Sequence, residues 1–337
     1  MLTTTAGAEI GFVIAYHDDG SRRRRDALRL ALASLRRQTD SGWHAYLCHD
    51  GSRDRGRTKF LAELADGMPG RLTVLGVARE RGLAGARNVA IRRAADDGCP
   101  LLAYLDPDDL SHPRRVASVR EMFAADPELD FVYTGMRFID ESSPPGSGAG
   151  LHFIDAGEIT PRLRGRECWR EQAVERELLA LPSAMNLRTR LALRYPFPEV
   201  PAGGETATLF RYLGSGAKID YADGIACGCR LPSADAGWRQ RRPADRHRLN
   251  EVRCRTERAG LADAVAEAVA RNAVDQGAGR EVLVRYLLRL SRTVTAEGSL
   301  EVGREQLRLA ATVDAEAFGR WAHEAERDLT RAASVGR

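Results

Sequence analysis

The first 140 residues alternate short apolar runs with longer segments in which apolar residues recur at helical spacing. The apolar runs are strand-length, and polar or glycine-containing stretches bound them. A regular alternation of strands and helices is typical of a mainly parallel sheet that helices cover. We therefore predict an α/β fold with strands at residues 10–16, 44–49, 72–77, 101–105 and 131–139, and with helices at residues 26–38, 58–64, 84–95 and 113–123.

The pattern changes beyond this alternating part. Residues 142–150 form a stretch of Ser, Pro, Gly and Ala that marks a boundary. After it we predict a helix between residues 164 and 179, a second helix after Gly204, and an extended segment over residues 218–230. This part would complete the domain that the first strands begin.

The C-terminal part predicts helices alone. From residue 243 the sequence is rich in Ala, Arg, Glu and Leu, and two amphipathic stripes recur at helical spacing. We predict four or five packed helices there, which serve packing or form a homodimer. The predicted organisation is thus an α/β domain at residues 1–242, with halves at 1–140 and 151–242, and an all-α region at residues 243–337.

Composition and charge limit the partners. The chain has 51 Lys and Arg against 47 Asp and Glu, a formal net charge of +4, which is too balanced to indicate nucleic-acid binding or a polybasic membrane surface. The six cysteines lack zinc-site spacing, which favours reduced thiols. We see no signal peptide, and no apolar run approaches the roughly 20 residues of a membrane-spanning helix. We expect a soluble, cytoplasmic protein.

Polar clusters follow four of the predicted strands. They are Tyr16–Asp19, His49–Ser52, Gly82–Asn88 and Asp106–Asp109. In open α/β sheets, ligands bind at the carboxyl ends of the strands. The sequence therefore predicts a ligand site at this edge of the sheet.

The acidic cluster is the most informative of the four. Asp106, Asp108 and Asp109 stand within four residues, where their charges repel unless a hard cation such as Mg²⁺ or Mn²⁺ neutralises them. The alternative is a solvated acidic turn that caps the helix near Pro113. An EF-hand does not fit, because Ser111 and Ala117 stand where that loop needs Gly and Glu. A dinucleotide site does not fit either, because no G-x-G-x-x-G opens a helix.

Taken in order, HDGS at residues 49–52, GLAGARN at 82–88 and LDPDD at 105–109 resemble the motifs of family 2 glycosyltransferases with the GT-A fold. The resemblance covers residues 10–138 well and residues 181–230 more weakly. It implies transfer of a sugar from a nucleotide-sugar donor with inversion at the anomeric carbon. It also implies that Mn²⁺ or Mg²⁺ stabilises the charge of the departing nucleoside diphosphate.

The resemblance also implies roles for individual residues. Asp50 would accept a hydrogen bond from a uracil-type base, which makes a UDP-sugar the expected donor, and Arg87 would lie near the base and the diphosphate. Asp106 would face the ribose and share the cation with Asp108. The alternatives are a turn or cap role for Asp50 and a surface position for Arg87. The full predicted donor set is Ala15, Tyr16, Asp50, Gly82, Arg87, Asp106, Arg230 and Arg239.

An inverting transferase needs a general base for the acceptor hydroxyl. The resemblance points to Glu205, but Thr206 replaces the Asp that the family carries next to it. Glu205 could be the base, or it could only stabilise its helix through the N-terminal dipole.

The sequence allows alternative roles for two further segments. Arg230 matches a family Arg near the diphosphate, while Pro232 replaces a family His. Residues 237–242 could form a lid, with Arg239 on the phosphates and Trp238 against a sugar face, or a solvated linker. Residues 22–25 are four arginines that predict a solvated helix entry, with weak steering of an anionic donor as an alternative.

The prediction is thus a metal-dependent inverting glycosyltransferase. Its acceptor is unknown and could be a natural product, a glycan or a peptide, which the helical tail could help to recognise. The alternative is a nucleotide-sugar-binding protein without catalysis, which the change at Thr206 motivates. A nucleotidyltransferase is disfavoured, because no Gly-rich basic loop follows the first strand.

Overall fold

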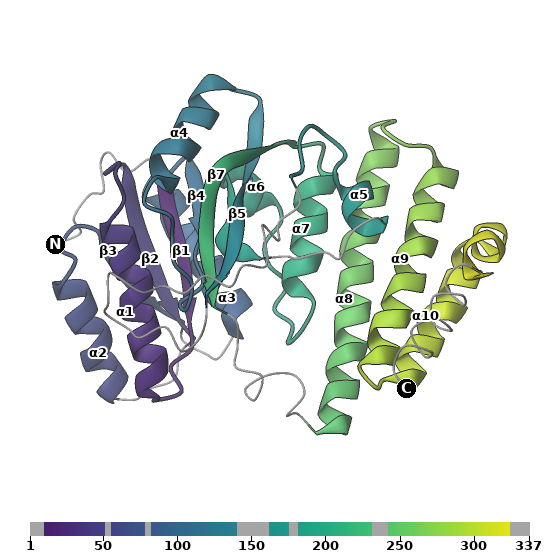
Figure 1. Cartoon of the computed structure of the whole chain (residues 1–337), viewed down its shortest axis with the longest axis horizontal. Coiled ribbons are helices and arrows are strands. Elements are labelled where there is room, and N and C mark those ends of the chain that lie inside the picture. The colour runs from purple at the N-terminus through teal and green to yellow at the C-terminus, as the bar shows by residue number, and fades with distance from the viewer. Residues whose placement is uncertain are drawn as a thin grey trace. The chain divides into compact units, whose positions relative to one another are not determined.

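A computed structural model describes residues 10–50, 55–77, 82–139, 162–174, 181–230 and 242–323 (Figure 1). Its contacts group the chain into two compact units. The first comprises Met1–Gly165, Leu181–Glu199 and Ala217–Ala234, and the second comprises Arg166–Ala180, Val200–Gly216 and Asp235–Arg337.

The first unit is built on one sheet. Among the described residues it has seven strands in the order β3-β2-β1-β4-β6-β5-β7. Strand β6 runs antiparallel to both of its neighbours, β4 and β5, and the other neighbouring strands pair in parallel. The strands are β1 (Ile10–Tyr16), β2 (Trp43–His49), β3 (Leu72–Gly76), β4 (Leu101–Tyr104), β5 (Leu129–Ile139), β6 (Met185–Arg188) and β7 (Lys218–Arg230).

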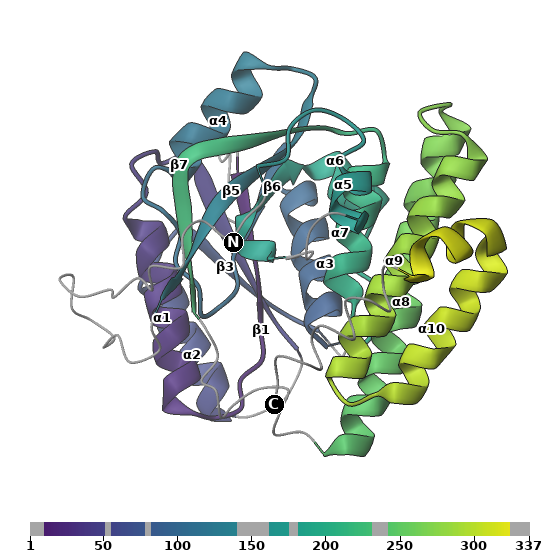
Figure 2. The ribbon, with the colours of Figure 1, turned by 45° about the vertical axis from the view of Figure 1, so that its right-hand side comes forward.

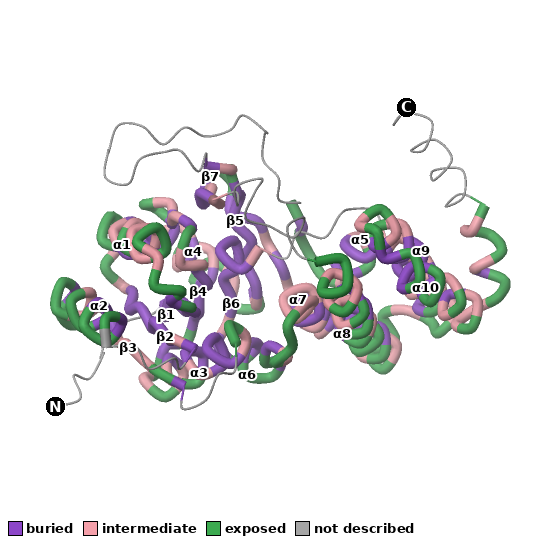
Figure 3. Tube along the Cα trace, turned by 90° about the horizontal axis from the view of Figure 1, so that it is seen from below, coloured by how far each residue is buried: buried purple, intermediate pink, exposed green. Residues whose placement is uncertain are grey.

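Helices cover both faces of this sheet, so the central strand is apolar on both sides (Figures 2 and 3). In β1, Phe12 and Ile14 join a core cluster with residues of α1 (Arg22–Arg36), α2 (Arg55–Asp66) and α4 (Arg115–Ala125). Gly11 lies on the opposite face, where a Cβ would come 3.0 Å from Ala94 of α3 (Gly82–Asp96). This two-sided burial explains why β1 reads as a continuous apolar run.

The predicted α/β class and mainly parallel sheet are confirmed, but the sequence did not predict one part of the sheet. Strand β6 follows a 3-10 turn (Pro182–Ala184) and leads directly into α6 (Thr189–Arg194). Four residues are too few for a recognisable alternation. Asn186 in β6 is buried and bonds the Val132 carbonyl of β5, so tertiary pairing holds this strand in the sheet.

The second unit is helical. It contains α5 (Trp169–Val174), α7 (Gly204–Gly214), α8 (Pro243–Ala270), α9 (Gln276–Ala296) and α10 (Leu300–Val313), and residues 315–323 are helical as well. Helices α7, α8, α9 and α10 pack successively against one another, and α5 packs on α9. A Cβ at Gly260 of α8 would lie 2.5 Å from the Cα of Ala207 in α7, so this contact requires glycine.

The compact units therefore do not follow the predicted boundary between residues 242 and 243. Helices α5 and α7 precede that boundary but pack with the C-terminal helices. The described residues include no helix that is both apolar and long enough to cross a membrane.

Candidate active site

Hydrogen bonds between strands bring three of the predicted polar clusters to one edge of the sheet. The backbone amide of Asp50 donates to the Tyr16 carbonyl (3.2 Å), and that of Leu105 donates to the Val13 carbonyl (3.1 Å). The loops after β1, β2 and β4 are thus neighbours, because these strands are parallel and adjacent. Ala15 and Tyr16 themselves bury their side chains in the core.

The acidic cluster forms a tight turn that Arg87 stabilises. The Asp109 amide donates to the Asp106 carbonyl (3.1 Å), and Arg87 Nη2 donates to Asp106 Oδ1 (2.8 Å). Arg87 is 4% exposed, and its guanidinium lies 5.3 Å from the ring centre of Phe197. It is therefore not a surface arginine. Gly82 opens α3 with φ of +65°, a conformation that favours glycine at this loop-to-helix junction.

The other two aspartates differ in environment. The Asp108 side chain keeps contact with solvent, yet partial desolvation and the Asp106 charge raise its pKa. Asp109 is only 4% exposed, and burial, together with repulsion from Asp106 and Asp108, raises its pKa to about 8. Asp106 and Asp108 are thus the two carboxylates that could reach a cation, whereas Asp109 points into the protein.

The described residues could bind a cation only if a bound ligand supplied further oxygen atoms. Within the described ranges, no three His, Cys, Asp or Glu side chains converge to form a metal site. Asp106 and Asp108 supply hard oxygen donors of the kind that Mg²⁺ and Mn²⁺ prefer. A divalent ion there would need further oxygens, such as those of a diphosphate.

The end of β7 is fixed against this acidic turn. Leu110 and Gly228 exchange two backbone hydrogen bonds of 2.8 and 2.9 Å. The Arg230 amide donates to Asp109 Oδ1 (3.0 Å), and Arg230 Nε donates to the Asp108 carbonyl (3.3 Å). The structure thus brings Arg230 to the predicted site, 122 residues after Asp108 in the sequence.

Asp50 is buried, and its two carboxylate oxygens differ in their contacts. The residue is 7% exposed, and its Oδ2 contacts His17 Nδ1. The other oxygen, Oδ1, lies 4.0 Å from Arg57 Nη1 and has no hydrogen-bond partner among the described residues. A buried, unsatisfied carboxylate oxygen costs free energy unless a ligand supplies a donor. This argues against a simple turn role for Asp50.

Sequence reasoning missed Arg57, which is 2% exposed. A signal was available: Arg57 lies three and four residues before Phe60 and Leu61, which are buried on the same helix. An arginine on the apolar face of a short helix indicates a buried partner. Here the nearby charge is that of Asp50.

The arginine run begins α1, and Arg22, Arg23 and Arg24 are exposed, as expected for a solvated helix entry, while two of the four arginines also pair with the loop after β1. Arg25 pairs with the buried Asp18 (Nη2 to Oδ2, 3.0 Å), and Arg24 pairs with Asp19 (Nε to Oδ2, 3.1 Å). These carboxylates offset the unfavourable placement of positive charge at a helix N-terminus. Two of the four arginines therefore help to order the loop that carries His17.

Glu205 lies in the first turn of α7, in the second compact unit. Its neighbour Thr206 hydrogen-bonds to the buried Glu257 of α8, which also accepts from Tyr286 Oη (2.8 Å). The role of Glu205 as base stays a prediction. Pro232, Trp238 and Arg239 lie outside the described residues.

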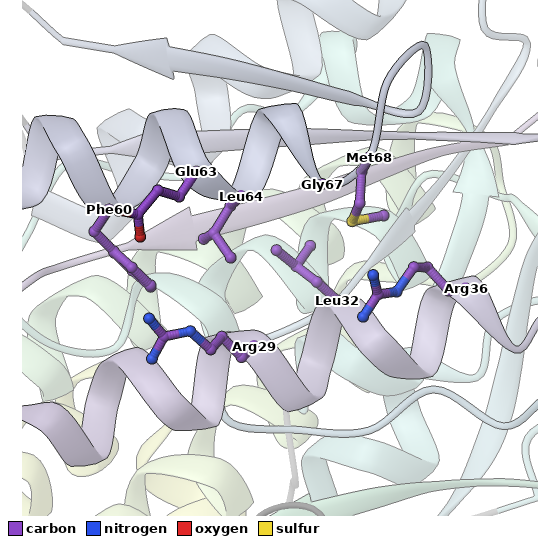
Figure 4. A pocket seen from close by; sticks show the side chains of 8 residues that line it. All are labelled: Arg29, Leu32, Arg36, Phe60, Glu63, Leu64, Gly67 and Met68. Carbon is purple, nitrogen blue, oxygen red and sulfur yellow. The ribbon is translucent and has the colours of Figure 1, made fainter.

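A separate cleft of about 220 Å³ lies between α1 and α2 (Figure 4). Leu32, Phe60, Leu64 and Met68 give it an apolar lining, and Arg29 lies over the Phe60 ring at 4.8 Å from its centre. None of the predicted site residues lines it. It is a seam between two helices rather than part of the site at the strand ends.

Several solved structures are similar to this chain. S. aureus TarS 1-349 in complex with UDP-GlcNAc has 12% sequence identity and a TM-score of 0.56, over 95% of this chain and 92% of that chain. A mannosyltransferase from Pyrobaculum calidifontis, in complex with GDP-Man and Mn²⁺, has 16% identity and a TM-score of 0.51, over 95% and 80%. GalNAc-T7 with UDP, GalNAc and Mn²⁺ has 13% identity and a TM-score of 0.52, over 78% and 52%.

At these identities the likeness establishes the GT-A fold alone. No curated protein matches the sequence. The family model of glycosyl transferase family 2 matches residues 13–168, which carry Asp50, Arg87 and the acidic turn. Residues 13–168 thus match glycosyl transferase family 2, and this match together with the GT-A fold supports an enzyme of the family 2 glycosyltransferase type.

Proposed function

We propose that this enzyme transfers a sugar from a UDP-linked donor to an acceptor nucleophile, with a divalent cation and with inversion at the anomeric carbon. The observation that carries the proposal is the buried Oδ1 of Asp50, which lies 4.0 Å from Arg57 Nη1 but accepts no hydrogen bond from the residues that the structure describes. It lies at the same sheet edge as the Arg87–Asp106 ion pair and the Asp108 carboxylate.

The chemistry of Asp50 favours a base with an N–H donor. The imide N–H of uracil would satisfy Oδ1 with one charge-assisted hydrogen bond. Thymine presents the same edge, and guanine also carries N–H donors. UDP-GlcNAc and GDP-Man are both bound by proteins of similar fold, so the base must be tested directly.

Asp106 and Asp108 would hold the cation, together with oxygens of the donor diphosphate. Repulsion from Asp106 contributes to the raised pKa of Asp108, and a positive ion between the two carboxylates would relieve it. Bound there, the cation would offset the charge that develops on the leaving diphosphate. The oxygen donors suit Mn²⁺ and Mg²⁺ equally.

The chain's own residues would then orient and activate the reactants. Arg87 fixes the Asp106 carboxylate through its 2.8 Å bond, and Arg230 would add positive charge near the phosphates. Glu205 would remove the proton from an acceptor hydroxyl while the oxygen of that hydroxyl attacks the anomeric carbon. The bond from that carbon to the phosphate oxygen breaks, and the nucleoside diphosphate leaves.

Calorimetric titration with UDP, GDP and dTDP in the presence of Mn²⁺ tests the proposed base. We expect UDP to bind more tightly than GDP. Asp50→Ala should weaken UDP binding by about 10- to 100-fold, because it removes a hydrogen bond to a charged group worth about 1.5–3 kcal/mol. Asp96→Ala, which removes an exposed aspartate of α3, is the matched control.

Release of nucleoside diphosphate from a panel of UDP-sugars then tests the reaction. Tighter binding of GDP, or an Asp50→Ala variant that binds UDP like the wild type, would contradict the proposal for the donor. UDP binding without any turnover across a broad acceptor panel would instead favour a binding protein.

For the C-terminal helices we propose first a packing role. Helix α7, which carries Glu205, contacts α8 through the close approach of Ala207 and Gly260. Truncation before α8 would therefore uncover α7 and should give an unstable protein rather than an active fragment. The mass of the intact chain in solution tests whether these helices also form a homodimer.

A further inference from the structure

Asp109 connects three segments that are distant in the sequence. Its carboxylate accepts from the Arg230 amide (3.0 Å) and is hydrogen-bonded by the Ser183 hydroxyl. The same hydroxyl accepts from the Asp106 amide (2.8 Å). The network thus links the acidic turn, the segment before β6 and the end of β7.

The backbone around Asp109 reinforces this link. Leu110, the next residue, forms its two-hydrogen-bond bridge with Gly228. Gly228 lies against Ile139, and a Cβ at this glycine would clash with the Ile139 side chain. Gly228 therefore lets β7 lie close to Ile139 of β5, while the bridge to Leu110 holds this end of β7 beside the acidic turn, and Arg230 follows two residues later.

We propose that Asp109 is a positioning residue that acts through Arg230. By accepting the Arg230 amide at a buried position, it fixes the start of that side chain beside the acidic turn. The Arg230 guanidinium, whose Nε already bonds the Asp108 carbonyl at 3.3 Å, is then held where the donor diphosphate would bind. The inference rests on the proposed function, since it assigns Arg230 to that diphosphate.

A role for Asp109 as a third cation ligand fits the structure less well. Asp109 is 4% exposed, whereas the Asp108 side chain reaches solvent. Its carboxylate is already engaged by the Arg230 amide, by the Ser183 hydroxyl and by the Cys229 thiol. A cation would have to displace these donors from inside the protein, at the cost of leaving them unsatisfied.

A double-mutant cycle on the full chain tests the proposal, with UDP affinity in Mn²⁺ measured by calorimetry. Arg230→Ala should weaken UDP binding by about 10- to 100-fold, the range for hydrogen bonds between charged groups. Asp109→Ala should weaken it by about tenfold. If Asp109 acts through Arg230, the double variant should bind within about threefold of Arg230→Ala alone.

Asp109→Asn separates positioning from ligation. It keeps an oxygen acceptor for the Arg230 amide, so we expect UDP binding within about threefold of the wild type. A loss as large as that of Asp108→Ala would instead make Asp109 a cation ligand and overturn the proposal. This variant decides the question even if Asp109→Ala does not fold.

The outcomes distinguish the inference from the proposed function. If Arg230→Ala weakens binding and the losses of the two single variants multiply in the double variant, Asp109 does not act through Arg230, and the proposed function is unaffected. If Arg230→Ala binds UDP like the wild type while Asp50→Ala does not, both the inference and the assignment of Arg230 to the diphosphate are wrong.

Discussion

Thr206 stands where the resemblance to family 2 glycosyltransferases predicts an aspartate, and its surroundings predict the effect of introducing that residue. The Thr206 hydroxyl hydrogen-bonds to Glu257, which is 7% exposed and also accepts from Tyr286 Oη. Thr206→Asp would place a second carboxylate against a buried one. We therefore expect this variant to destabilise the second compact unit.

Two estimates limit how much free energy of unfolding Thr206→Asp can cost. Two like charges about 4 Å apart repel by about 4 kcal/mol at an effective dielectric constant of about 20. Protonating one of the two carboxylates at pH 7 instead costs about 4 kcal/mol. Thr206 is half-buried, and the positive charge of Arg253 acts on Glu257, so solvent and this arginine offset part of the repulsion. We expect a loss of about 2–3 kcal/mol.

Urea unfolding of the full chain at pH 7.5 and pH 5 checks this value. The loss should shrink at pH 5, because the folded variant takes up a proton that relieves the repulsion. In the wild type, burial raises the pKa of Glu257 above 4.5, so the free energy of unfolding falls as pH rises from about that value through the raised pKa.

The matched control is Thr206→Asn, which has a similar shape to the aspartate and no charge. The double variant Thr206→Asp with Glu257→Gln should recover most of the loss. If Thr206→Asp is as stable as Thr206→Asn at pH 7.5, the repulsion does not exist, and Glu257 does not explain the departure from the family pattern.

Three further predictions concern single side chains. Asp108→Ala should abolish the Mn²⁺-dependent part of UDP binding, and equal affinity with and without Mn²⁺ in both the variant and the wild type would exclude a cation role. Glu205→Gln should spare UDP binding but lower transfer by roughly 10²–10⁴-fold, as expected for loss of a general base; near wild-type turnover would exclude Glu205. Gly260→Ala should cost about 1–3 kcal/mol in urea unfolding, because its Cβ would meet Ala207, and unchanged stability would mean that α8 can shift.

Much of the first unit could be predicted because its signals are local. Strand β1 agrees with the predicted residues 10–16, since a strand buried on both faces must be apolar throughout. Strand β6 could not be predicted, because its four residues include the buried polar Asn186, which tertiary hydrogen bonds satisfy. The grouping of α7 with the C-terminal helices was also hidden, because helix contacts depend on side chains distant in the sequence.

The candidate site also has some features that the sequence predicted and others that it did not. The motifs predicted that Asp50, Arg87 and the acidic turn lie together, because parallel strands place their following loops at one edge of the sheet, and the structure shows this placement. They did not show that Arg57 lies near Asp50 or that Asp109 points inward. Both depend on which side chains the packed structure excludes from water.

By itself, the sequence determined the α/β class and the order of the strand-end motifs, and it predicted Asp106 and Asp108 as ligands of a cation. Only the tertiary structure decided that Asp109 binds the Arg230 amide and that Thr206 meets Glu257. The physical reason is that periodicity and local motifs record which residues are apolar or polar. The partner of a buried polar group is selected by packing among segments that the sequence separates.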